Sequence, residues 1–130
     1  MLVKPLTFMN ESGSAVAPLA DFYRVDLAHT VVVHDDLDLP LGSLRIKSGG
    51  GDGGHNGLRS LRASLGSGDF LRVRVGIGRP PGRMDAASYV LRRFAKAELA
   101  EVTLIVPQAA DAVEMLVTDG LAPTQNTFNN

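Results

Sequence analysis

Three aspartates directly after a run of valines are the first residues that could do chemistry. Thr30-Val-Val-Val-His34 predicts a strand buried on both faces, and the chain continues into Asp35, Asp36 and Asp38. Open α/β sheets bind ligands beyond the carboxyl ends of their strands. Carboxylates there could bind a divalent metal, orient a histidine base or stay solvated, and spacing alone leaves all three open. Asp35, expected first after the strand, is best placed to orient a base.

A glycine-rich loop is the second candidate. Residues 48–57, SGGGDGGHNG, contain six glycines in ten positions. The loop lacks both the P-loop ending and the GxGxxG spacing, which argues against nucleotide binding by those routes. It still lets a bulky ligand approach the backbone, and it ends in His55 and Asn56 at the predicted start of a helix. Alternatively, Asn56 merely caps that helix, because Asn is a preferred N-cap residue.

Basic side chains alternate with apolar ones in two further segments, residues 43–47 and 70–77, which predict strands. The basic residues are Arg45 and Lys47 in the first strand, and Arg72 and Arg74 in the second. If the strands lie close together, these cations form a phosphate clamp. With only 5% aromatic residues, base stacking cannot dominate, so contacts to a nucleic-acid backbone are expected.

The charge distribution favours a polyanionic partner, although the net charge is only −1. Between Arg45 and Lys96, eleven Lys and Arg residues face three Asp residues, whereas the flanking segments are acidic. A polyanion responds to such a local field rather than to the total charge. The alternative is a solvated basic surface without a ligand.

Length and composition predict one domain, residues 1–130, because 45% apolar and 21% charged residues are typical of a soluble globular chain. The absence of cysteine excludes disulfides and thiolate metal sites, and three scattered histidines form no metal-ligating pattern. No metal or cofactor is therefore expected. No apolar run reaches the roughly 18 to 20 residues of a membrane span, so a cytoplasmic protein is expected.

The elements that position these residues alternate between strands and helices. The spacing predicts a helix capped by Ser12 or Ser14 that is kinked or delayed by Pro18, and a second helix after the glycine-rich loop that stops at Gly66. A short helix over Ala86–Phe94 and a long one from Leu99 to Gly120 follow. The long helix is expected to bury a stripe of Leu99, Val102, Val106, Ala109, Val113 and Leu116. This order predicts an α/β fold: a mixed, twisted sheet with helices on both faces.

Strands are scarce for this fold class. Besides the three described, only a stub at Leu2–Lys4 suggests a strand, and a buried strand at residues 30–34 requires neighbours on both sides.

Four motifs together resemble the bacterial peptidyl-tRNA hydrolase family, in order and in spacing. They are TFMNESG (residues 7–13), HDDLDLPLG (34–42), KSGGGDGGHNGLRS (47–60) and FLRVRVGIGRP (70–80). The resemblance covers essentially the whole chain, and RPPGR and DGLAPTQN are similar to actinobacterial members.

The resemblance implies an esterase that cleaves the bond between a peptide and the 3′ end of tRNA, and so recycles stalled peptidyl-tRNA. It also implies a monomer. In the family a histidine is the general base, and the aspartate matching Asp35 keeps that imidazole basic. The remaining matches are Asn10, Asn56, Phe8 and Met9 in the cleft for the 3′ terminus and peptide, His55 in a supporting role, and Lys47 and Arg74 in the clamp for tRNA phosphates.

This sequence departs from the family at its beginning. The family's N-terminal strand and helix, with a GLGNPG-type loop and the RHN motif of the catalytic histidine, are expected to be missing, and His29, His34 and His55 do not align with that histidine. Because a positioned base contributes about 10² to 10⁴ in rate, the chain alone is expected to be nearly inactive.

Two other functions remain open. One is a noncatalytic RNA-binding module on the same fold, and the other is a metal-dependent phosphoesterase that uses Asp35, Asp36 and Asp38. Retention of Asp35, Asn10 and Asn56 favours the hydrolase, since binding tRNA phosphates needs no residue that orients a base.

Overall fold

The computed structural model describes residues 1–129, which divide into two compact units. The helical unit comprises Met1–Thr30 and Ser48–Leu71, and the sheet unit comprises Val31–Lys47 and the chain from Arg72 onward. No helix in the described part is both long and apolar enough to span a bilayer.

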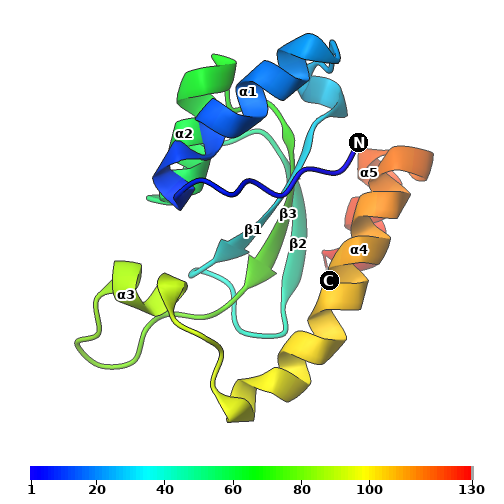
Figure 1. The fold of residues 1–130 in the computed structure, drawn as a ribbon. Helices are drawn as coiled ribbons and strands as arrows, with labels where there is room; N and C mark the ends of the chain where they lie inside the picture. The colour runs from blue at the N-terminus through cyan, green and yellow to red at the C-terminus, as the bar shows by residue number, and fades with distance from the viewer. Residues whose placement is uncertain (130) are drawn as a thin grey trace. The chain divides into compact units, whose positions relative to one another are not determined.

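The sheet has three strands in the order β1-β3-β2: β1 (Val31–Asp36), β3 (Leu71–Gly76) and β2 (Leu44–Ser48) (Figure 1). β1 and β3 are parallel, because the N–H of Leu71 donates to Thr30 and that of Ile77 donates to Asp36. β3 and β2 are antiparallel, because the N–H of Gly76 donates to Ser43 and that of Gly49 donates to Phe70. The predicted α/β class with a mixed sheet is confirmed.

The antiparallel register brings the two basic segments together. It sets Arg45 directly opposite Arg74 and Lys47 directly opposite Arg72, on the same face of the sheet. The other face carries apolar side chains, of which Leu44, Ile46 and Val73 are buried. The strands are therefore neighbours, as the phosphate-clamp hypothesis requires.

Two expectations about the strands are wrong. β1 is not buried on both faces, since Val33 is 51% exposed; in the described sheet β1 is an edge strand that pairs with β3 alone. The stub at Leu2–Lys4 forms no strand.

The long C-terminal helix completes the core of the sheet unit. α4 (Leu99–Asp119) ends at Gly120, as predicted. A further helix, α5 (Leu121–Phe128), follows it and was not predicted from the sequence pattern. The buried stripe of α4 differs from the predicted one, because Leu99 and Val106 are exposed. The residues it buries are Ile105, Ala109, Ala112 and Leu116.

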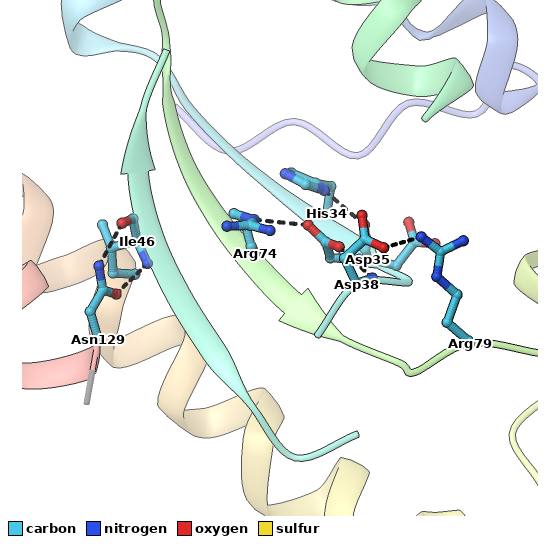
Figure 2. Close-up of polar contacts among 8 residues, drawn as sticks. His34, Asp35, Asp38, Ile46, Arg74, Arg79 and Asn129 are labelled. Atoms are coloured by element: carbon cyan, nitrogen blue, oxygen red, sulfur yellow. Dashed lines mark hydrogen bonds and ion pairs between the residues drawn. The ribbon is translucent and has the colours of Figure 1, made fainter. Parts of the chain in front are cut away.

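The outer edge of β2 is closed by a side chain from beyond α5. Asn129 Oδ1 accepts the N–H of Ile46 at 2.6 Å, and its Nδ2 donates to the carbonyl of Ile46 at 2.8 Å (Figure 2). The carboxamide thus pairs with β2 as a neighbouring strand would, which satisfies backbone groups at a sheet edge. The remaining helices of this unit are α3 (Ala86–Leu91) and the 3₁₀ turn η3 (Lys96–Glu98).

The helical unit contains α1 (Ser12–Phe22), α2 (Asn56–Leu65) and the 3₁₀ turns η1 (Met9–Glu11) and η2 (Leu27–His29). Neither predicted serine caps α1, because Ser12 and Ser14 direct their hydroxyls back to the carbonyls of Met9 and Glu11. Pro18 lies inside α1, so a delayed start is also wrong.

Gly13 allows α1 and α2 to pack closely. Its N–H donates to Ser60 Oγ at 2.8 Å, and a Cβ at this position would lie 2.3 Å from the carbonyl oxygen of Ser60. Because the obstructing atom belongs to the backbone, any larger residue would push the helices apart.

We therefore expect Gly13→Ala to lower the free energy of unfolding by about 1–3 kcal/mol, as overpacking typically does, although Ala is the better helix former by about 1 kcal/mol. Urea denaturation measures the change. Gly51→Ala is the matched control, since a Cβ there meets no atom within 4 Å and its φ is not positive. Unchanged stability of Gly13→Ala would contradict the close packing.

Candidate functional site

The start of α2 presents the first group of candidate residues. His55 is the N-cap, and its Nδ1 accepts the N–H of Leu58 at 3.1 Å. Asn56 is the first residue of the helix, so the alternative in which Asn56 is the cap is wrong. Because His55 takes the capping role, the carboxamide of Asn56 is available for other contacts.

A pocket of about 440 Å³ is lined by residues of η1 and α2. It is lined by Asn10, Asn56, Arg59, Ser60, Ala63 and Ser64. The structure thus brings the two predicted carboxamides, Asn10 and Asn56, into one pocket. Two carboxamides, two hydroxyls and one guanidinium can donate several hydrogen bonds to a polar or anionic ligand.

The other predicted cleft residues lie beside this pocket or at the surface. A Cβ on Gly57 would lie 2.8 Å from Cε1 of His55 and 3.1 Å from Cγ of Met9, so these side chains flank the start of α2. Phe8 precedes η1 and is 80% exposed.

Ser60 and Ser64 are pocket residues that were not predicted from the sequence. In α2, Ser60 and Ser64 lie four and eight residues after Asn56, and Arg59 lies three residues after it. Helical spacing places all of them on one face. The sequence does contain this signal, because polar residues recur at helical spacing after Asn56.

Asp52 fastens the glycine-rich loop to α2. Its carboxylate accepts the N–H of Gly54 at 2.9 Å and lies 3.4 Å from Nη1 of Arg62 and 3.8 Å from Nε of Arg59. The hydrogen bond from Gly54, together with both guanidinium groups, lowers the pKa of Asp52 despite an opposing effect of desolvation. The carbonyl of Asp52 also accepts the N–H of His55 at 2.8 Å, which fixes the entry to the helix.

The acidic cluster lies in the sheet unit, and Asp35 is not where it was expected. β1 continues through Asp36, so Asp35 is inside the strand rather than after it. The pleat turns consecutive side chains to opposite faces, which separates Asp35 from Asp36. The Nδ1 of His34 donates to the backbone carbonyl of Asp35 at 2.8 Å (Figure 2).

Arginines hold the other two aspartates. Asp36 Oδ2 accepts Nε–H of Arg74 at 2.8 Å, Asp36 Oδ1 accepts the N–H of Asp38, also at 2.8 Å, and Asp38 pairs with Arg79 (Figure 2). Among the described residues, no three His, Cys, Asp or Glu side chains are grouped to hold a metal. Within the part described, the contacts of Asp36 and Asp38 are those of ion pairs, not of a metal site.

The environment of Asp36 favours its charged form. Burial acts to raise the pKa of this carboxyl, but the hydrogen bonds from Arg74 and Asp38 and the charges of Arg74 and His34 outweigh it, so the pKa lies below the ordinary 3.8. Asp36 is therefore a carboxylate at neutral pH.

The four basic side chains on one face of β2 and β3 differ in their exposure. Arg45 and Lys47 are exposed, whereas the Arg74 side chain is 24% exposed and Arg72 is 3% exposed. Arg72 is therefore buried and presents no surface to a ligand. We call Arg45, Lys47 and Arg74 the basic face.

Comparison with known proteins identifies the family. The family model described as peptidyl-tRNA hydrolase matches residues 1–130. The chain belongs to the peptidyl-tRNA hydrolase family. It is 60% identical over 129 residues to a peptidyl-tRNA hydrolase of Frankia alni and 59% identical over 126 residues to one of Mycobacterium tuberculosis; these matches cover 99% and 97% of this chain.

Solved structures agree with this assignment. The structure of peptidyl-tRNA hydrolase from Acinetobacter baumannii matches with a TM-score of 0.87 and 34% identity, over 96% of this chain and 63% of that one. Each of the two curated relatives is covered to 66% of its length. The chain therefore spans about two thirds of the relatives it matches, and the predicted family resemblance is confirmed.

The lowered pKa of Asp36 predicts a pH-dependent contribution to stability. A depressed folded-state pKa stabilises the fold above the unfolded value, and this contribution disappears as the pH falls through the folded value. We expect the difference in unfolding free energy between the unsubstituted chain and Asp36→Asn to shrink as the pH is lowered from about 6 to about 3. Because Arg74→Gln lacks the guanidinium that lowers the pKa of Asp36, the unfolding free energy of this variant should lack the same pH-dependent contribution. A difference that stays constant over this range would contradict the ion pair.

Proposed function

We propose that this chain is the greater part of an enzyme that hydrolyses the ester bond between peptide and tRNA in peptidyl-tRNA, and so recycles stalled peptidyl-tRNA. The observation that carries the proposal is the family match over residues 1–130, which is joined by a pocket that contains both matching carboxamides, Asn10 and Asn56. The same resemblance supports one hydrolase-like domain, acting in the cytoplasm as a monomer without a cofactor.

The proposal assigns the general base to a histidine outside this sequence. Each histidine in the chain has another contact: His29 pairs with Asp26, His34 bonds to the carbonyl of Asp35, and His55 caps α2. In the reaction, the base takes a proton from water, the resulting hydroxide attacks the ester carbonyl carbon, and the 3′ oxygen of tRNA leaves with a proton. Asp35 would orient that histidine, as the family resemblance implies.

Asn10 and Asn56 would bind the reacting end of the substrate. Carboxamide N–H groups can donate to a carbonyl oxygen and stabilise the negative charge that develops on it. Met9 and Phe8 would supply apolar contacts beside them, and His55 would support the site by fixing the start of α2.

The basic face would bind tRNA through its phosphates. Lys47 offers a mobile ammonium and Arg74 a guanidinium, and the register places both strands' cations on one side of the sheet. A noncatalytic RNA-binding module would use the same surface, so hydrolysis is the property that distinguishes the two functions.

We expect the 130-residue chain to hydrolyse peptidyl-tRNA at least about 10²-fold more slowly than a version extended at its N-terminus by the corresponding segment of the Frankia alni relative, because a positioned base contributes that much or more. Single-turnover release of peptide from labelled peptidyl-tRNA measures both rates. Equal rates would contradict the assignment of the base, and no hydrolysis by either protein, with tRNA still bound, would favour the RNA-binding module.

The N-terminally extended protein is also the background in which the role of Asp35 is tested. Asp35→Asn should lower turnover while leaving tRNA affinity nearly unchanged, because an orienting carboxylate acts on the base and not on the phosphates. A large loss of affinity instead would show that Asp35 serves binding.

Loss of a phosphate contact should change the salt dependence of binding. We expect Lys47→Ala and Arg74→Ala each to weaken binding of uncharged tRNA and to reduce the slope of log Kd against log salt by about 1. Lys96→Ala removes the same charge from η3, outside the basic face, and is the control. If all three variants lose affinity equally, then general charge rather than this face binds tRNA.

A further inference from the structure

Asp36 and Arg74 form a hydrogen-bonded ion pair that neither the family match nor the proposed roles explain. The two side chains are 15% and 24% exposed, and Oδ2 of Asp36 lies 2.8 Å from Nε of Arg74. The other oxygen of Asp36 accepts the backbone N–H of Asp38 at 2.8 Å. The carboxylate is therefore fixed by the loop after β1 and in turn fixes the guanidinium (Figure 2).

The hydrogen bond uses only one edge of the Arg74 guanidinium. Nε donates to Asp36, and among the residues described here the structure gives no hydrogen bond to Nη1 or Nη2 of Arg74. A guanidinium has five N–H donors arranged as a rigid fork, and its Nη1/Nη2 end can bind two oxygens of one phosphate at once. The contact with Asp36 thus leaves that end for a ligand.

The neighbouring charges show why Arg74 needs an anchor. Arg45 lies directly opposite Arg74 across the antiparallel pair, and like charges in opposed positions repel. Arg72, two residues away on the same face, adds a third positive charge. The carboxylate of Asp36 opposes this repulsion and holds Arg74 beside Arg45.

We propose that Asp36 is a positioning residue for tRNA binding: it holds Nε of Arg74 so that the Nη1/Nη2 end is presented to a backbone phosphate. This inference rests on the proposed function. It extends that function to a residue that contacts no substrate and that carries the same charge sign as the ligand. Asp36 acts through Arg74 alone.

Charge and positioning predict opposite results when Asp36 is removed. By charge alone, loss of a carboxylate from a phosphate-binding face strengthens tRNA binding. If Asp36 positions Arg74, Asp36→Asn weakens tRNA binding, because the guanidinium loses its fixed orientation and must be ordered when tRNA binds. The sign of the change therefore separates the two effects.

The experiment measures the Kd of uncharged tRNA for the 130-residue chain at several salt concentrations, for the unsubstituted chain and for Asp36→Asn, Arg74→Ala, the double variant and Asp38→Asn. Asp38→Asn removes the same charge two residues away, from an aspartate that pairs with Arg79 instead. Thermal unfolding of each variant verifies that it is folded at the assay temperature.

We expect Asp36→Asn to weaken binding by about tenfold, and Asp38→Asn to leave it unchanged or slightly stronger. With Arg74→Ala already present, Asp36→Asn should cause no further loss, because no guanidinium remains to be positioned. A purely structural role for Asp36 would lower affinity equally with or without Arg74.

Three results would overturn the inference. If Asp36→Asn strengthens binding as Asp38→Asn does, while Arg74→Ala weakens it, positioning is wrong and the proposed function stands. If Asp36→Asn weakens binding equally in the Arg74→Ala background, Asp36 has a structural role only. If the unsubstituted, folded chain fails to bind tRNA, the proposed RNA-binding face is wrong, and the role of Asp36 is wrong with it.

Discussion

The register between β2 and β3 is the constraint on which the candidate RNA-binding surface depends. Hydrogen bonds from Gly76 to Ser43 and from Gly49 to Phe70 fix it. With this pairing, the basic side chains of both strands share one face and the apolar ones share the other. A slip of one residue in β2 would bury Arg45 and Lys47 and expose Leu44 and Ile46, so the hydrophobic core and the charge pattern select the same register.

Two different devices then position the polar residues. In the helical unit, Gly13 brings the helices together, Asp52 fastens the glycine-rich loop and His55 caps α2, which leaves Asn56 free to line the pocket with Asn10. In the sheet unit, carboxylates hold guanidinium groups, as Asp36 holds Arg74. Both devices rely on hydrogen bonds to fixed backbone or charged partners, which are stronger than contacts between mobile surface side chains.

Local patterns predicted the elements well, and long-range contacts account for most of what they missed. The alternation in β2 and the leucine spacing and Gly66 end of α2 are found as expected. The edge position of β1 and the pairing of Asn129 with Ile46, 83 residues away, depend on tertiary arrangement that no local pattern encodes. Likewise, the family motifs marked Asp35 and Arg74, but only the pleat and the register show that Asp36 is the aspartate that holds Arg74.

The most direct test of this account is a crystal structure of the chain bound to a tRNA acceptor stem. The account predicts a backbone phosphate within hydrogen-bonding distance of Lys47 Nζ and of Nη1 or Nη2 of Arg74, with Nε of Arg74 still donating to Asp36. A stem bound elsewhere, for example along α4, or a phosphate that replaces Asp36 at Nε, would contradict it.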